Sequence, residues 1–91
     1  MQLVELELES LKLALKAMIV KECDKDIAPE AIQDDEALIG GALELDSLDA
    51  LQICLAVKER YDVRIEGGRA ARQALASVAA LANTILEAKA A

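Results

Sequence analysis

The stretch DSLDALQICLAVKERY, residues 46–61, predicts one well-bounded helix around which the rest of the chain can be arranged. Asp46 belongs to the residue types favoured at the N-cap of a helix, so we expect the helix to run over Ser47–Tyr61. Asp62 and the β-branched Val63 mark its end, because neither residue type favours continuing a helix.

Apolar side chains cover two arcs of this helix when its positions are placed at about 100° per residue. The broader arc holds Ala50, Ile53, Cys54, Val57 and Tyr61. The second arc, roughly 100° or more from the centre of the first, holds Leu48, Leu51 and Leu55, which we call the leucine strip. A helix at the rim of a small bundle needs one buried stripe, so the leucine strip is either additional core or an apolar surface offered to another protein.

Residues 3–22 are expected to form the first helix. Apolar residues recur there at steps of three and four, and basic residues lie mostly between them. The apolar set is Leu8, Leu11, Leu15, Met18 and Ile19, and the basic set is Lys12, Lys16 and Lys21. The opening letters LVELELE alternate as a strand does, but so short a strand with no partner nearby is the weaker interpretation.

A long loop over residues 24–46 is expected to join these two helices. It contains Pro29 and the pair Gly40-Gly41, and residues 29–32 are compatible with a single helical turn. A loop of more than about 20 residues is unusual in so small a domain and usually has a function.

The C-terminal part predicts a short helix over residues 69–73 and a final helix capped by Ser77. The apolar residues that share one face of the final helix are Val78, Leu81, Ala82 and Ile85.

The composition favours helices over strands. Among 91 residues there are 18 Ala and 15 Leu, and Tyr61 is the single aromatic residue. We therefore expect an all-α fold, a small four-helix bundle of three main helices and one short helix, as one domain over residues 1–91.

The composition also excludes several kinds of function. The chain has no His, which removes Ser-His and Cys-His nucleophile pairs and imidazole metal ligands, so neither a catalytic residue nor a metal site is expected. A net charge of −7 argues against nucleic-acid binding. The longest charge-free run, residues 73–86, is too short to cross a bilayer, so no membrane insertion is expected.

The two cysteines point to a reducing compartment. Cys23 and Cys54 form no CxxC motif and are too few for a disulfide scaffold, which fits reduced thiols in a cytoplasmic protein. Cys54 lies in the broader apolar arc and is expected to be a small buried hydrophobe. Near the N-terminus Glu5, Glu7 and Glu9 stand where a signal peptide has a basic start.

Acidic charge is concentrated in residues 24–49. This segment holds nine acidic residues against the single base Lys25, a net charge of −8, whereas the rest of the chain has eight acids and nine bases. The segment is either a solvated acidic loop or a surface that basic partners recognise.

Ser47 is the residue of this segment most suited to chemistry. It is the first residue of the expected helix, where free backbone N–H groups and the positive end of the helix dipole favour an attached phosphate. A serine with no base beside it is a poor nucleophile. Ser47 is therefore better suited to being modified than to catalysing.

The chain resembles the acyl carrier protein family over nearly its whole length. The resemblance is carried by the motif Asp46-Ser47-Leu48-Asp49, by Leu51, Ile53, Val57 and Tyr61, by YDVRI (residues 61–65) and by LASVAAL (residues 75–81). It implies a carrier rather than an enzyme, with 4′-phosphopantetheine transferred from coenzyme A to Ser47 by a phosphopantetheinyl transferase. The thiol of that arm would hold an acyl group as a thioester.

The resemblance also implies a face that partner enzymes recognise, and an aliphatic interior that can shelter a fatty chain. Asp46 and Asp49 would contact basic residues of the partners. If the leucine strip (Leu48, Leu51 and Leu55) is a docking face, Lys58 lies one turn further on the same side and repels a partner patterned to meet acids there. The expected partners are a phosphopantetheinyl transferase and acyl-ACP ligase or ketosynthase-type enzymes, met by a monomeric carrier.

The sequence departs from the family pattern in its second helix. Bacterial carriers of fatty-acid synthesis usually have an acid-rich second helix, whereas this one has Gln52 and then Lys58-Glu59-Arg60. Leu45 and the run LIGGAL, residues 38–43, look more like carriers of a specialised fatty acid, polyketide or aryl polyene pathway. An aminoacyl or D-alanyl carrier and an unmodified helical interaction module remain the alternatives.

Overall fold

The structure is a computed structural model that describes the backbone of residues 2–41 and 43–90 and the side chains of residues 7–41 and 43–90. Met1, Ala42 and Ala91, which belong to the expected domain 1–91, lie outside the described residues. The element order is α1 (Gln2–Glu22), the 3-10 turn η1 (Pro29–Ala31), α2 (Ser47–Tyr61), α3 (Arg69–Ala74) and α4 (Val78–Ala90). The described backbone has no β-strand, so the expected all-α bundle of three main helices and one short helix is confirmed.

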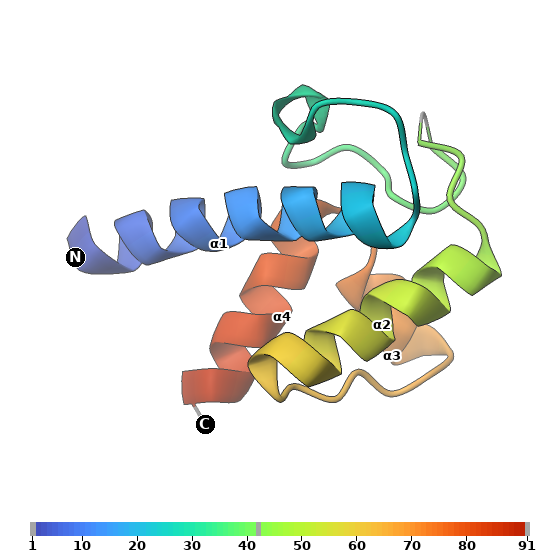
Figure 1. Cartoon of the computed structure of the whole chain (residues 1–91). Helices are drawn as coiled ribbons and strands as arrows, with labels where there is room; N and C mark the ends of the chain where they lie inside the picture. Colours follow the sequence, from blue (N-terminus) through green and yellow to red (C-terminus); the bar gives the residue numbers. More distant parts are fainter. Residues whose placement is uncertain (1, 42, 91) are drawn as a thin grey trace.

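The helices pack around α1. This helix contacts α4, α2 and η1, and α3 packs against α4. Figure 1 shows α4 crossing below α1, with α3 behind α2 and with the long loop passing over α1 before it reaches α2. The radius of gyration is 12.2 Å, and the molecule measures 35 × 27 × 20 Å along its principal axes.

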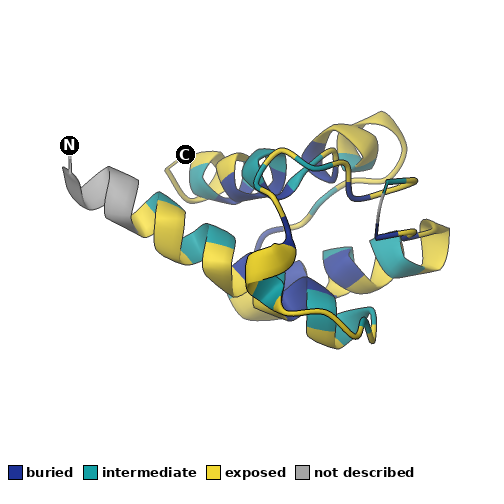
Figure 2. Ribbon diagram, turned by 90° about the horizontal axis from the view of Figure 1, so that it is seen from above, coloured by how far each residue is buried: buried dark blue, intermediate teal, exposed yellow. Residues whose placement is uncertain are grey.

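The core forms where the apolar faces of the helices meet. The faces predicted for the first and last helices are confirmed, because Leu15, Met18 and Ile19 of α1 and Val78, Leu81, Ala82 and Ile85 of α4 are buried. In α2 the broader arc points inward: Ile53 and Val57 are fully buried, and Ala50, Cys54 and Tyr61 pack partly buried against the core. Figure 2 shows these buried segments on the helix faces that point toward one another.

The strand-like alternation near the N-terminus does not produce a strand. Residues 2–22 form one continuous helix, and Leu8 and Leu11 are partly buried against the core. A strand needs a neighbouring strand to satisfy its backbone N–H and C=O groups, and the described residues offer none, whereas a helix satisfies these groups within itself.

The long loop is fastened to two helices. Asp34 lies 2.9 Å from Lys12 Nζ and 2.7 Å from Lys16 Nζ, and its backbone oxygen accepts a hydrogen bond of 2.9 Å from Ala79 N at the start of α4. Leu38 N donates to Ala76 O just before α4, at 3.4 Å. These contacts hold the loop against α1 and α4, so that it forms part of the wall beside α2 and α3.

The loop also contributes core residues and needs its glycine pair. Its buried side chains are Ile32, Leu38, Leu43 and Leu45. Gly40 has a φ of +76°, which L side chains rarely adopt, and a Cβ at Gly41 would collide with the backbone oxygen of Ala37. Gly41 therefore requires glycine, and glycine at position 40 avoids the strain that a side chain would bring at this φ. The chain folds back here so that Ile39 and Leu45 form a bridge.

Candidate functional site

Ser47 is the exposed first residue of α2, held by a capping box. The side chain of Asp46 accepts a hydrogen bond of 3.0 Å from Asp49 N, and Asp46 N donates to the side chain of Asp49, also at 3.0 Å. The backbone oxygen of Asp46 accepts from Ala50 N at 2.9 Å. The structure thus brings Asp46, Ser47 and Asp49 together and leaves the side chain of Ser47 open to solvent.

The capping box changes one expectation about Ser47. The N–H groups at the start of the helix are not all free for a phosphate, because the side chain of Asp46 accepts a hydrogen bond from Asp49 N. The hydrogen bond from Asp49 N, with smaller help from Leu48 N, lowers the pKa of Asp46 below its usual value of 3.8. The carboxylate of Asp46 therefore competes with an anion on Ser47 for the donors at this helix start.

A groove opens beside Ser47, with a volume of about 630 Å³. Its walls come from the end of the loop, from the first turn of α2, and from α3 with the connection on either side of it. The lining residues are Ala37, Ile39, Ser47, Ala50, Gly68, Ala71, Arg72, Leu75 and Ala76. Most of these side chains are small or aliphatic, so the groove offers apolar contact next to the serine.

The leucine strip faces solvent. The exposed fractions of Leu48, Leu51 and Leu55 are 71%, 55% and 53%. The interpretation of this strip as additional core is therefore wrong, and α2 presents one buried and one exposed apolar side. Apolar side chains that recur on an exposed side of a helix are typical of a surface for another molecule.

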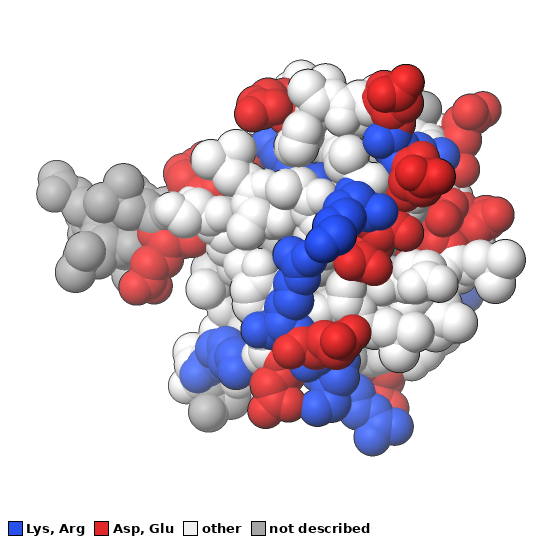
Figure 3. All heavy atoms as spheres, in the orientation of Figure 1, with Lys and Arg blue, Asp and Glu red and all other residues white. Residues whose placement is uncertain are grey.

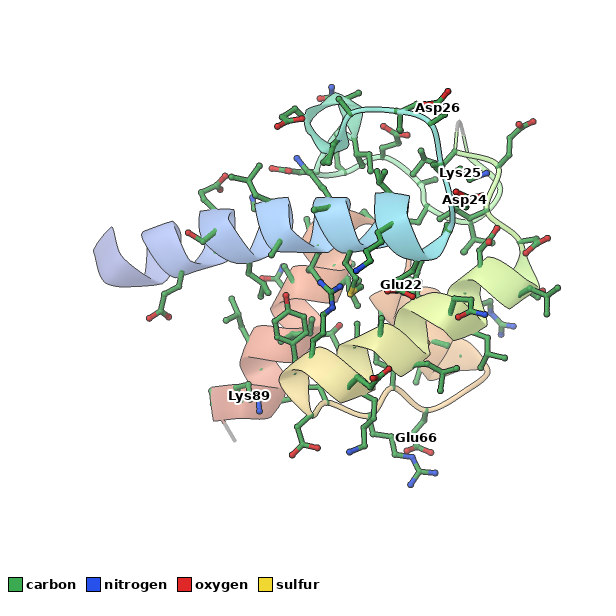
Figure 4. All side chains as sticks on the ribbon, in the orientation of Figure 1. Glu22, Asp24, Lys25, Asp26, Glu66 and Lys89 are labelled. Carbon is green, nitrogen blue, oxygen red and sulfur yellow. The ribbon has the colours of Figure 1, made fainter. Side chains whose placement is uncertain are left out.

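Lys58 and Arg60 have acidic neighbours. Lys58 Nζ lies 2.7 Å from a carboxylate oxygen of Asp62, the C-cap residue of α2, and this contact lowers the pKa of Asp62. Arg60 lies 4.0 Å from Glu22, which Figure 4 shows at the end of α1, between α1 and α2. The repulsion expected from Lys58 is thus reduced, because a carboxylate accompanies the ammonium group.

The acidic segment covers the loop and the start of α2. Figure 3 shows mostly acidic side chains over the loop, at the upper right, and charges of both signs lower down. Figure 4 places Asp24, Lys25 and Asp26 where the chain leaves α1. Asp34 differs from its acidic neighbours because it pairs with two bases of α1: Lys16 and Lys12 hold its pKa below the usual value. The surface around Ser47 is therefore acidic on its loop side.

Both thiols are partly buried and poorly ionised. Burial, together with the nearby carboxylate of Asp49, raises the pKa of Cys23 to about 11. Burial also raises the pKa of Cys54. The expectation that Cys54 is a buried hydrophobe is thus met only in part, because its side chain retains some exposure at the edge of the core.

Sequence reasoning missed the groove and the fastening of the loop. The groove combines Ile39, Ala50, Ala71 and Leu75 from three segments, and no local pattern marks them as neighbours. Arg72 could have been noticed as a base on a short helix near Ser47, but only the packing places it in the same groove.

Among the described residues no cluster of three or more Cys, Asp or Glu is arranged to hold a metal ion. No helix in the described part of the chain is both long and apolar enough to cross a bilayer.

Comparisons of the chain with protein-family models, with curated proteins and with solved structures find no match.

Proposed function

We propose that this protein is an acyl carrier that holds its cargo as a thioester on 4′-phosphopantetheine attached to Ser47. The observation that carries the proposal is the exposed hydroxyl of Ser47 at the start of α2, beside an apolar groove of about 630 Å³. When bound, the arm supplies a thiol on which acyl groups form and exchange thioesters. The chain supplies the attachment point, the groove and the surface that partner enzymes recognise.

The attachment reaction requires a partner enzyme. The chain has no His, and the carboxylates of Asp46 and Asp49 accept hydrogen bonds from backbone N–H groups in the capping box. Each carboxylate is thus engaged by a backbone N–H group, and among the described residues no hydrogen bond joins either of them to the hydroxyl of Ser47. A transferase would take the proton of Ser47 while Oγ forms a bond to phosphorus and the nucleotide part of coenzyme A leaves.

The groove supports a cargo with an aliphatic part. Ile39, Ala50, Ala71 and Leu75 present hydrocarbon surface beside Ser47, and transfer of apolar surface out of water is favourable by about 25 cal/mol per Å². A short polar cargo would gain little from such a lining. This difference favours an acyl carrier over an aminoacyl or D-alanyl carrier.

The exposed leucine strip and the acids around Ser47 support docking of enzymes. A partner could bury Leu48, Leu51 and Leu55 while its basic residues approach Asp46 and Asp49. Because the base Lys58 lies at the end of this face, where bacterial carriers of fatty-acid synthesis usually have acids, we infer partners of a specialised pathway rather than the enzymes of general fatty-acid synthesis.

The state of the two cysteines is compatible with a thioester carrier. A neighbouring thiolate would attack a thioester and remove the cargo, but the thiols of Cys23 and Cys54 have raised pKa values and stay protonated at neutral pH. The acyl group is thereby protected from transfer to the chain itself.

The proposal is tested by intact mass after incubation with coenzyme A, Mg²⁺ and a broad-specificity phosphopantetheinyl transferase. We expect the wild-type chain to gain one phosphopantetheine group and Ser47→Ala to gain none. Ser10→Ala is the matched control, since Ser10 is exposed on α1 and its loss should leave the modification unchanged.

Two outcomes would contradict the proposal. An unmodified wild-type chain would leave an unmodified interaction module, and modification that persists in Ser47→Ala would place the arm elsewhere. Loading of the modified chain by an aminoacyl ligase, but by no acyl ligase, would favour the aminoacyl carrier.

A further inference from the structure

The groove beside Ser47 contains one cationic side chain, Arg72 of α3. Among the described residues that line the groove, Arg72 is the only ionisable one, and Ser47 lines the same groove from α2. Figure 1 shows α3 behind α2, and the groove between them is lined by residues of both helices, Ser47 and Arg72 included.

An anion attached to Ser47 would enter acidic surroundings. Residues 24–49 have a net charge of −8, and Asp46 and Asp49 flank the serine. A phosphodiester on Ser47 adds a further negative charge close to these carboxylates. The N–H groups at the start of α2 offer reduced compensation, because the carboxylate of Asp46 already accepts a hydrogen bond from Asp49 N.

The guanidinium of Arg72 is available for such an anion. No carboxylate lies within 4.0 Å of it in the part of the chain whose side chains are described, whereas Lys12, Lys16, Lys58, Arg60 and Arg64 each have an acidic neighbour. Arginine binds phosphate oxygens through two parallel N–H donors, which fixes orientation as well as charge.

We propose that Arg72 binds the phosphodiester of the arm on Ser47 and thereby directs the arm along the groove. This inference rests on the proposed function, since it requires a phosphate at Ser47. It assigns Arg72 a positioning role: the guanidinium holds the phosphate, and the remainder of the arm then lies over Ala71, Leu75 and Ala76.

The experiment compares the melting temperature of each chain before and after modification. In the wild type we expect the arm to raise it by about 2–5 °C, as a charged hydrogen bond at an exposed position does in a chain of this size. Arg72→Gln should lose this gain, and Arg72→Lys should recover part of it. Arg69→Gln is the matched control, because Arg69 lies on the same helix with the same charge but does not line the groove.

A second measurement separates direct binding from a general effect on the fold. The Nε–H resonance of Arg72 should shift when the arm is attached, and it should shift equally in Arg69→Gln. Because Arg72 is exposed, circular dichroism should show the same helix content in all unmodified variants.

The outcomes distinguish this inference from the proposed function. If the arm is attached but Arg72→Gln keeps the full gain, the inference is wrong and the carrier function stands. If no variant is modified, the proposed function fails and the inference fails with it. If Arg69→Gln loses the rise in melting temperature as Arg72→Gln does, the rise comes from the overall positive charge of α3 and not from a specific contact of Arg72, and the inference is wrong.

Discussion

Asp49 is the residue at which the start of α2, the acidic surface and the partly buried thiol of Cys23 meet. Its carboxylate accepts a hydrogen bond from Asp46 N in the capping box, and it also raises the pKa of Cys23 at the end of α1. One carboxylate therefore stabilises the helix beside Ser47 and adds to the effect of burial, which is the main cause of the raised pKa of Cys23. Asp46 has the complementary role in the capping box, because it accepts from Asp49 N.

The pKa of Cys23 leads to a test at the level of single residues. In Cys54→Ser protein, alkylation of Cys23 should follow a pKa of about 11 rather than 9.0. At a given pH well below 9.0, the thiolate fraction should then be about 100-fold smaller than for an ordinary thiol. The measurement is the rate of iodoacetamide modification as a function of pH, with mass spectrometry as readout.

Asp49→Asn in the same background provides the control. Because Asp49 disfavours the thiolate of Cys23, its neutralisation should lower the pKa of the thiol and speed alkylation. An alkylation profile centred near 9.0 in the parent protein would show that Cys23 is more solvated than the structure describes.

At the level of elements, α2 separates stability from recognition on two sides of one helix. The inner side packs Ile53 and Val57 at full burial, and the outer side presents the leucine strip. A residue on the inner side and a residue on the outer side are thus expected to respond differently to the same truncation.

Leu51→Ala and Ile53→Ala form a matched pair for this expectation. Ile53→Ala should lower the free energy of unfolding by about 2–5 kcal/mol, because it opens a cavity in the core. Leu51 is 55% exposed, so Leu51→Ala should change the free energy of unfolding by no more than about 0.5 kcal/mol. Urea unfolding measures both values, and the rate of acyl loading of the modified protein measures recognition.

The free energy of unfolding and the rate of acyl loading should respond differently to Leu51→Ala. Leu51→Ala should slow loading by every partner while the fold remains intact. A large loss of stability in Leu51→Ala would mean that the leucine strip is buried in solution, and unchanged loading would mean that partners dock elsewhere.

In the whole molecule, the long loop is held by ionic and backbone contacts to α1 and α4. Asp34 joins Lys12 and Lys16, one turn apart on α1, and its backbone oxygen accepts from Ala79 N of α4. The position of Ile39 in the groove depends on this arrangement, since the loop reaches the groove only after Asp34.

The ion pairs of Asp34 predict how stability changes with pH. The two lysines lower the pKa of Asp34 below 3.8, so the carboxylate stabilises the fold while it is ionised. This contribution is complete at neutral pH and is lost as the pH falls below 3.8 toward the folded-state pKa. Asp34→Asn should therefore be less stable at pH 7 by about 1 kcal/mol or less, since the carboxylate is partly exposed.

Melting curves from neutral to acidic pH test this prediction. The melting temperatures of the wild type and of Asp34→Asn should converge as the pH falls below 3.8. Asp35→Asn is the control, because Asp35 is exposed beside Asp34 and has no lysine within 4.0 Å among the described side chains. A constant difference across the pH range would mean that Asp34 acts through its backbone contacts alone.

The helices could be predicted from residue order because their signals are local. Asp46 at the N-cap, Ser77 before the last helix, and apolar residues at steps of three and four each act within a few residues of the element they specify. The boundaries of α2 therefore agree with the prediction, and α3 differs from it by one residue. Ser47 was identifiable in the same way, since its place at the start of a helix depends on its immediate neighbours.

Contacts between distant segments required the folded chain. The burial of Ile53 and the exposure of Leu51 depend on where α1 and α4 lie, although both residues belong to apolar arcs of one helix. Asp34 meets Lys12 across 22 positions of the chain, and Ser47 shares a groove with Arg72. Periodicity within one helix contains no information about which side its neighbours will cover, because that choice is made by packing the whole core at once.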